Sequence, residues 1–348
     1  MQIKIGLLSP FLPEKDGIAI YSGNILRGLG KYREFIVTIG RQGSKADCIV
    51  DFKSISLRKE LERIIKKENL SLIHIQYVPT LFGKYNLNLG LIAALNLSVP
   101  VIVTLHEVHY LSKGLRNKIL SSIEKRIVEK AAKVIVHTPN QKKFLEHKCK
   151  TGNIATIYHG LRLDKMPKRK NNRNILCFGM ISHGKGVPYL IGAMKYLPAY
   201  NLTIAGNFVD KATENEVRDA LKRPISNIET EFKWINEEKK EKYFKKANIV
   251  VLPHIWAPYQ SGVLHNAVQW GLPVVATKAG ALHEMAELFK FGEVVEPKNP
   301  KALAEGIKKV FKNYRLYEKG IIEYRTAANW PKIANEHLEL YKKVINKK

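Results

Sequence analysis

Residues 248–284 read NIVVLPHIWAPYQSGVLHNAVQWGLPVVATKAGALHE, and this stretch decides the fold that we expect. An apolar run, 249–252, is stopped by a proline. After a loop, apolar residues with helical spacing begin at Ser261 and stop at Gly271. A β-branched run, 274–277, then leads into a second glycine-containing loop. The order strand, loop, helix, strand and loop is typical of a parallel α/β layer.

The two loops of this stretch are expected at the carboxyl ends of neighbouring strands. Open α/β sheets bind their ligands at this edge. The backbone N–H groups of Ser261, Gly262 and Val263 would lie at the start of a helix, where they have no partner within the helix. Such groups suit an anion such as a diphosphate. The stretch therefore predicts a phosphate-binding site.

Length and composition limit the class of protein. With 348 residues, the chain is too long for one ordinary core and fits two domains, and its apolar fraction of 45% is normal for a soluble globular protein. Met1 leads almost directly into the strand-like residues 3–8, so we expect no secretory signal peptide.

Three widely spaced cysteines without CxxC spacing indicate buried thiols in a reducing cytoplasm. Residues 85–105 carry no charge, but polar residues and a proline interrupt them, which favours a buried helix and strand over a membrane span.

The charge is strongly positive and concentrated in one segment. The formal net charge is +27. Residues 108–173 hold seventeen Lys and Arg against four Asp and Glu. Within them, apolar residues recur at every fourth position from Leu111 to Ala131, as on one face of a helix. Two interpretations stay open: a core-packed helix with a solvated basic side, or a surface for anionic lipid headgroups or a phosphorylated acceptor. No ribonucleoprotein motif, zinc spacing or KH-type loop is present, so we expect no nucleic-acid partner.

Strand-like and helix-like segments alternate through the first half of the chain, which predicts a doubly wound domain. No GxGxxG follows the first strand, which argues against a nicotinamide or flavin site. Residues 162–174 are polar and basic and lack apolar periodicity, as in a linker between domains. A second domain begins with the strand-like residues 175–178.

These features together resemble the retaining family 4 glycosyltransferases, also called glycosyltransferase group 1, which have the GT-B fold. Two glutamates that are usual in the family would fall at Pro258 and Asn266. The chain therefore resembles a Gln-Ser-Gly-Val subgroup that lacks this glutamate pair. The residues that carry the resemblance are Leu252, Pro253, Gln260, Ser261, Gly262, Val263, Ala267, Gly271, Leu272, Pro273, Val274, Val275, Ala276, Thr277, Gly280 and Glu284.

The resemblance implies an α/β fold with two doubly wound, Rossmann-like domains that face each other across a cleft. Residues 1–165 would form the acceptor-side domain and residues 166–173 the linker. Residues 174–325 would form the nucleotide-sugar donor domain. Residues 326–348 would form a helix that crosses back to the first domain.

The resemblance also implies a donor site. The glycine-rich loop 179–186 suits a phosphate cradle, although such turns are also common in purely structural roles. Lys185 matches the family's diphosphate lysine, whereas Met180 stands where the family has arginine, with His183 as a partial substitute. Gly17 would lie near the donor phosphates or serve as a plain turn glycine. Ile235 would contact the nucleobase and Asn266 the ribose. The expected donor-binding residues are Gly17, Gly179, Lys185, Gly206, Ile235, Gln260, Ser261, Gly262, Val263, Asn266 and Glu284.

His106 is the expected catalytic residue. It follows the apolar run 101–105 and should emerge at the carboxyl edge of the sheet. A lone histidine is more often structural, but the resemblance places a histidine here against the transferred sugar. The sequence His-Glu-Val-His from His106 to His109 does not have the zincin spacing, and we expect no metal.

The function that we expect is transfer of a hexose-type sugar, with retention of configuration, from a nucleotide-diphosphate sugar to a hydroxyl acceptor. The acceptor would be a glycan, a lipid-linked compound or an anionic molecule, and no cofactor is expected. The chain would be cytoplasmic, with peripheral contact to an anionic inner membrane face as the finer hypothesis. Three alternatives stay open: a degenerate GT-B protein that binds nucleotide sugar without catalysis, a nucleotide-sugar 2-epimerase, and a basic nucleic-acid-interaction module.

Overall fold

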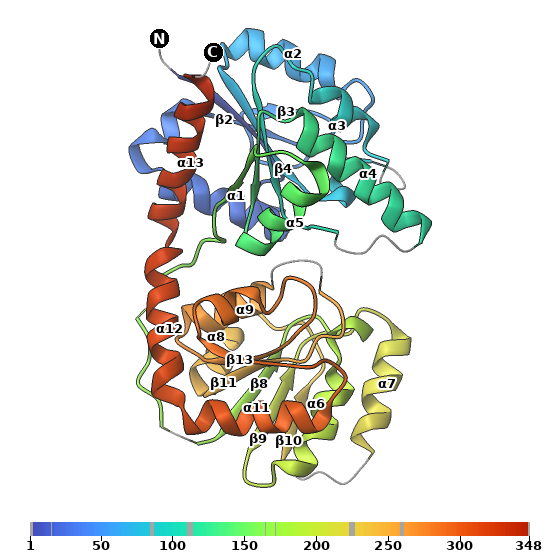
Figure 1. Ribbon diagram of the computed structural model, residues 1–348, viewed down its shortest axis with the longest axis vertical. Helices are drawn as coiled ribbons and strands as arrows, with labels where there is room; N and C mark the ends of the chain where they lie inside the picture. Colours follow the sequence, from blue (N-terminus) through green and yellow to red (C-terminus); the bar gives the residue numbers. More distant parts are fainter. Residues whose placement is uncertain are drawn as a thin grey trace. The chain divides into compact units, whose positions relative to one another are not determined.

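The chain folds into two compact α/β units. The computed structural model describes residues 3–14, 16–83, 87–109, 114–163, 165–170, 172–222, 227–257 and 261–346. Unit 1 comprises Met1–Gly160 and Ala328–Lys348, and unit 2 comprises Leu161–Ala327. Each unit has one parallel β-sheet with helices on both of its faces (Figure 1). The two doubly wound sheets expected from the alternation of apolar runs are confirmed.

Unit 1 contains a seven-stranded sheet in the order β3-β2-β1-β4-β5-β6-β7. The central strands are apolar and buried on both faces, as parallel strands between helix layers must be. The strands are β1 (Ile5–Leu8), β2 (Ile36–Gly40), β3 (Cys48–Ile49), β4 (Leu72–Tyr77), β5 (Val101–Leu105), β6 (Lys133–Val136) and β7 (Ile154–Thr156). The helices are α1 (Gly17–Gly28), α2 (Leu57–Glu68), α3 (Leu89–Ala94), α4 (Leu115–Lys130), α5 (Pro139–Cys149) and α13 (Trp330–Ile345), with short 3-10 segments η1 (Gly30–Phe35) and η2 (Pro79–Leu81).

The two faces of this sheet have separate cores. Alternate residues of each strand point to opposite faces, so β5 sends Val103 to one core and Ile102 to the other. Helices α2, α3, α4 and α5 pack on the first face. Helices α1 and α13 pack on the second face, where Tyr21 and Tyr341 are fully buried. The last helix of the chain is therefore part of unit 1.

Unit 2 contains a six-stranded parallel sheet in the order β10-β9-β8-β11-β12-β13. The strand order reverses between β8 and β11, and ligands bind at such a switch point in open α/β sheets. The strands are β8 (Asn174–Phe178), β9 (Asn201–Ala205), β10 (Ile228–Glu231), β11 (Ile249–Leu252), β12 (Val274–Thr277) and β13 (Gly292–Val295). The helical segments are η4 (His183–Lys185), α6 (Val187–Ala193), η5 (Met194–Tyr196), α7 (Lys211–Leu221), α8 (Glu237–Lys246), α9 (Gly262–Gln269), α10 (Glu284–Leu288), α11 (Pro300–Lys312) and α12 (Tyr314–Ala327).

Part of the segment that the sequence suggests as a linker is held against unit 2. The guanidinium of Arg169 donates hydrogen bonds to the carbonyls of Phe244, Ala247 and Trp270 at 3.2, 2.9 and 2.7 Å. The charge-free run forms α3 and β5 as expected. In the described part of the chain, no helix has both the length and the apolar character needed to cross a membrane.

Candidate functional site

The start of α9 lies at the carboxyl edge of the unit 2 sheet. Ser261 is the N-cap residue, is 2% exposed, and makes no side-chain capping hydrogen bond. The first N–H groups of the helix, at Gly262 and Val263, are therefore not capped by that hydroxyl. Gln260, which the sequence assigns to the same site, lies outside the described residues.

The glycine-rich loop after β8 lies directly against the first turn of α9. A Cβ atom at Gly179 would be 3.2 Å from Cγ2 of Val263, and Gly179 has a φ of +106°. A Cβ atom at Gly206, at the end of β9, would be 1.9 Å from the carbonyl oxygen of Gly179. Gly206 requires glycine because its backbone lies so close to that of Gly179, and Gly179 favours glycine because of its positive φ. The structure thus brings together three of the predicted donor-site elements: the Gly179 loop, Gly206 and α9.

Lys185 is a half-buried cation at this edge. It ends η4, close to the buried thiol of Cys177 and to His254. Burial lowers the pKa of its ammonium group. Within the described residues, no carboxylate forms an ion pair with Lys185. His183, the expected partial substitute for the missing arginine, instead pairs with Glu216 at 2.9 Å, and Met180 is 57% exposed.

The other expected donor residues have varied surroundings. Asn266 is half-buried on α9, and Ile235 is half-buried in the loop between β10 and α8. Glu284 is 7% exposed and is the first residue of α10. The positions of these three residues do not test whether they contact a ligand, so each contact stays a prediction.

Gly17 differs from the expectation for its backbone. It begins α1 in unit 1, its φ is not positive, and a Cβ atom there would meet nothing within 4 Å. The Asp16 carboxylate accepts hydrogen bonds from the N–H groups of Ile18 and Ala19 at 2.6 and 3.4 Å. This helix N-terminus is therefore capped by a carboxylate, and no turn with positive φ explains the glycine. The approach of Gly17 to the donor phosphates stays a prediction.

His106 lies immediately after β5 in unit 1 and is 9% exposed. The Gln76 side chain lies 2.8 Å from its Nε2 atom, and Nε2 of His137 lies 3.3 Å from its Nδ1 atom. Nδ1 of His137 donates to the carbonyl of Ile157 at 2.9 Å, since a carbonyl can only accept. Both ring nitrogens of His106 thus have protein partners.

His106 belongs to a larger buried network that the sequence analysis missed. Gln76 also contacts His74, whose Nδ1 atom lies 2.7 Å from the hydroxyl of Tyr341 on α13. Burial lowers the pKa of His74 and His106 well below the ordinary value, and that of His137 to about 4, so all three are neutral at pH 7. The available signal was the spacing of His74 and Gln76, because alternate residues of an otherwise apolar strand share a face.

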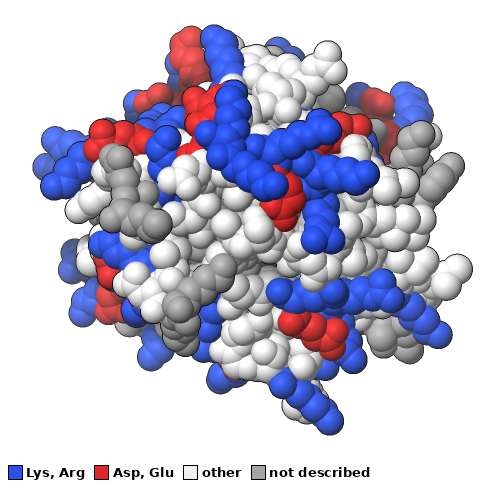
Figure 2. Space-filling view, turned by 90° about the horizontal axis from the view of Figure 1, so that it is seen from above, with Lys and Arg blue, Asp and Glu red and all other residues white. Residues whose placement is uncertain are grey.

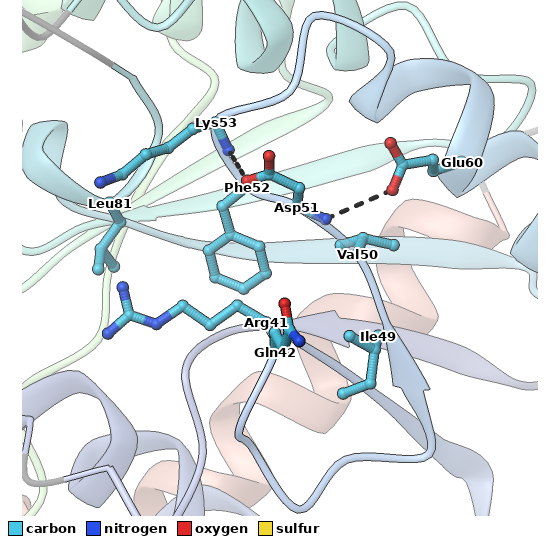
Figure 3. A pocket seen from close by; sticks show the side chains of 9 residues that line it. All are labelled: Arg41, Gln42, Ile49, Val50, Asp51, Phe52, Lys53, Glu60 and Leu81. Atoms are coloured by element: carbon cyan, nitrogen blue, oxygen red, sulfur yellow. Dashed lines mark hydrogen bonds between the residues drawn. The ribbon is translucent and has the colours of Figure 1, made fainter.

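A cavity lies at the carboxyl ends of β2 and β3 in unit 1 (Figure 3). The cavity has a volume of about 620 Å³. The side chains of Arg41 and Lys53 both extend toward Leu81 (Figure 3). Arg41 also forms an ion pair with Glu14. The backbone N–H of Asp51 donates to the Glu60 carboxylate at 3.4 Å. The cavity is lined by Arg41, Gln42, Ile49, Val50, Asp51, Phe52, Lys53, Glu60 and Leu81.

The basic character of the chain is visible at the surface. In Figure 2, Lys and Arg cover much of the visible face, with fewer Asp and Glu between them. On α4, the side chains of Lys118, Lys125, Arg126 and Lys130 are exposed, whereas Ile123 and Ile127 are buried. Leu115 was expected on the buried face but is 76% exposed, because it is the first residue of the helix. Among the described residues, no three His, Cys, Asp or Glu side chains are grouped so that they could hold a metal ion.

Both units match known protein families. Residues 163–326 match the family model of Glycosyl transferases group 1, and residues 50–165 match that of Glycosyltransferase Family 4. An uncharacterized glycosyltransferase of Methanocaldococcus jannaschii, MJ1607, is 29% identical over 184 residues, which are 49% of this chain. The match covers 45% of that protein, so the chain spans less than half the length of this curated relative.

Solved structures similar to this chain show the fold. Sucrose-phosphate synthase from Thermosynechococcus elongatus has a TM-score of 0.77 and 20% identity, over 99% of this chain and 100% of that one. A glycosyltransferase from Rickettsia africae has a TM-score of 0.75 and 17% identity, with both chains fully covered. Anabaena Alr3699/HepE in complex with UDP has a TM-score of 0.77 and 15% identity, over 98% and 100%. The chain therefore has the GT-B fold and contains two glycosyltransferase regions, one of family 4 in residues 50–165 and one of group 1 in residues 163–326.

Proposed function

We propose that the protein transfers a hexose-type sugar from a nucleotide-diphosphate sugar to a hydroxyl acceptor, with retention of anomeric configuration. One observation carries the proposal: Lys185 is a half-buried cation without a carboxylate partner among the described residues, in the loop that packs on the uncapped start of α9. A diphosphate would supply the missing negative charge and accept from the free N–H groups. Anabaena HepE, which has the same fold, has been solved with UDP-glucose.

The chemistry follows from this position. The bond between sugar C1 and the phosphate oxygen breaks, the acceptor oxygen forms the new bond to C1 and passes its proton to the departing phosphate oxygen, and the nucleoside diphosphate leaves. Negative charge develops on the leaving phosphate, where Lys185 and the N–H groups of Gly262 and Val263 would stabilise it. The nucleotide sugar is a substrate in this scheme, and no step is assigned to a cofactor. Ile235, Asn266 and Glu284 are assigned to the nucleoside and sugar of the donor on the family resemblance.

The cavity of unit 1 is assigned to the acceptor. Asp51 and Glu60 supply carboxylate oxygens, and Gln42 and Lys53 supply N–H groups, beside the apolar side chain of Leu81. Sugar hydroxyls both donate and accept hydrogen bonds, so this mixture suits a polyhydroxylated acceptor. A lipid-linked acceptor would also bring the exposed lysines of α4 to an anionic membrane surface.

His106 is assigned to the transferred sugar, again on the resemblance. Its ring is oriented by Gln76 and His137, which would fix its position without further rearrangement. The same two contacts favour a second candidate function, binding of the nucleotide sugar without transfer, because they leave His106 no ring nitrogen for a substrate hydroxyl. The two candidates differ in turnover and not in nucleotide affinity.

Thermal-shift screening with UDP-, GDP- and ADP-sugars tests the proposal. A ligand at a hundredfold excess over its Kd stabilises the folded state by about 2.7 kcal/mol. One nucleotide class should raise the melting temperature, and release of the free nucleoside diphosphate should then depend on an added acceptor. If no nucleotide sugar shifts the melting temperature, the proposal is wrong. If the shift occurs without any transfer, the binding-only candidate replaces it.

A further inference from the structure

His254 is a buried histidine at the edge of the unit 2 sheet with no role in the proposed transfer reaction. It follows β11 by two residues and is 1% exposed. Neither ring nitrogen forms a hydrogen bond with any described residue. The backbone carbonyl of Leu252 lies near the ring and raises its pKa. No hydrogen bond of normal geometry joins the two groups. Buried polar atoms without a partner are rare and call for an explanation.

The surroundings of His254 are those of the proposed diphosphate site. The N–H of Ile255 donates to the carbonyl of Gly184 at 2.9 Å. A Cβ atom at Gly186 would be 2.1 Å from the carbonyl oxygen of Pro253. The chain around His254 is therefore pressed against the loop that carries Lys185.

The charge state of His254 also reflects this neighbour. Burial, and to a lesser extent the Lys185 ammonium, lower the pKa of His254 to about 3. The ring is neutral at pH 7, with one N–H donor and one lone pair. A phosphate oxygen beside Lys185 would accept a hydrogen bond from that N–H group. It would also supply the negative charge that the Lys185 ammonium has no described carboxylate to provide.

We propose that His254 is a second ligand of the donor diphosphate and donates its ring N–H to a phosphate oxygen that Lys185 also binds. The inference rests on the proposed function and deepens it. It accounts for the exposed Met180 at the arginine position, because the loop needs a further donor and His254 supplies one from the loop after β11. It also accounts for a buried imidazole that has no partner among the described residues.

The test compares His254→Phe with His254→Gln by calorimetric titration. The probe is whichever of UDP, GDP and ADP binds the wild-type chain, together with the matching nucleoside monophosphate. Phenylalanine keeps a ring of similar shape but has no donor, whereas the glutamine amide can donate. His147→Gln is the matched control, because His147 is an exposed histidine of unit 1 and is not assigned to the diphosphate site.

We expect His254→Phe to weaken nucleoside diphosphate binding about tenfold or more, since the lost hydrogen bond has a charged acceptor. The affinity for the monophosphate should change less. His254→Gln should retain most of the affinity, and His147→Gln should bind like the wild type. The melting temperature of unliganded His254→Phe should not fall, because an apolar ring replaces buried polar atoms that had no partner.

Other results would overturn the inference alone or the proposed function with it. Unchanged diphosphate affinity in folded His254→Phe, with affinity still lost in Lys185→Ala, would overturn the inference and leave the proposed function standing. Absence of any nucleotide binding to the wild type would remove both. If His254→Phe does not fold, the ring ¹⁵N resonances of His254 in the wild-type protein decide instead. They should shift on addition of the diphosphate, and unchanged resonances at saturation would overturn the inference.

Discussion

The buried histidine network of unit 1 should make that unit sensitive to mild acid. His137 and His337 are both fully buried, and burial is the main reason that the pKa of each falls from 6.5 to about 4. The unfolded chain therefore binds protons at a higher pH than the folded chain. The stability that these neutral rings provide is fully present above pH 6.5 and is lost as the pH falls toward 4.

The magnitude follows from the two pKa values. A shift of one pKa unit corresponds to about 1.36 kcal/mol, so each of these histidines lowers the free energy of unfolding by about 2 kcal/mol between pH 8 and pH 5. Two such groups together remove about 4 kcal/mol, a large share of the 5–15 kcal/mol that is typical of a folded protein. His74 and His106 change in the same direction. The other titratable groups that face this core are Tyr21, His159, Glu336 and Tyr341.

Urea unfolding at pH 8, 7, 6 and 5 measures this loss. Trp330 lies in unit 1 with its ring 5.2 Å from that of Tyr21, and the other three tryptophans lie in unit 2. Replacing those three with Phe makes Trp330 fluorescence report on unit 1. His137→Gln should flatten the pH dependence because glutamine does not titrate, and replacing the exposed His147 with Gln should not. Equal stability at pH 8 and pH 5 would refute the reasoning.

Two further predictions concern transfer and membranes. His106→Ala should reduce turnover strongly, while nucleotide affinity, which we assign to unit 2, should change little. His137→Ala disrupts the same network and should lose activity only in step with its stability, so equal losses of specific activity in the two variants would reduce His106 to a structural role. Co-sedimentation with vesicles should increase with anionic lipid content and decrease with salt if residues 108–173 contact a membrane, and binding that ignores lipid charge would favour a merely solvated basic face.

The strands and helices of the opening stretch could be predicted because their apolar runs are long and clearly bounded. Residues 249–252 and 274–277 form β11 and β12 as expected, and α9 begins one residue after the expected start. The elements that the sequence analysis missed have weak patterns. In α7 the described buried residues are only Thr213 and Val217, and all four residues of β13 are half-buried. Their structure depends on packing that local periodicity does not encode.

In the candidate site, too, some residues could be predicted from the sequence and others could not. Glycine spacing and the helix start predict a phosphate site, and the structure brings Gly179, Gly206 and Val263 together. His254 could not be found in this way, because it lies in a loop that packs against the Lys185 loop, and the two loops are far apart in the sequence. The network around His106 was missed for a related reason: Tyr341 reaches His74 from the last helix of the chain.

The proposed function depends on the binding of a nucleoside diphosphate to unit 2 at Lys185. Calorimetric titration of the full chain and of Lys185→Ala with UDP, GDP and ADP tests it most directly, with Lys222→Ala as the control, because Lys222 is an exposed lysine of the same unit that pairs with Asp219. We expect Lys185→Ala to lose about 1.5–3 kcal/mol of binding free energy for the nucleotide that binds, the range for a hydrogen bond to a charged group, and Lys222→Ala to lose none. Equal affinity of the wild type and folded Lys185→Ala would contradict the claim.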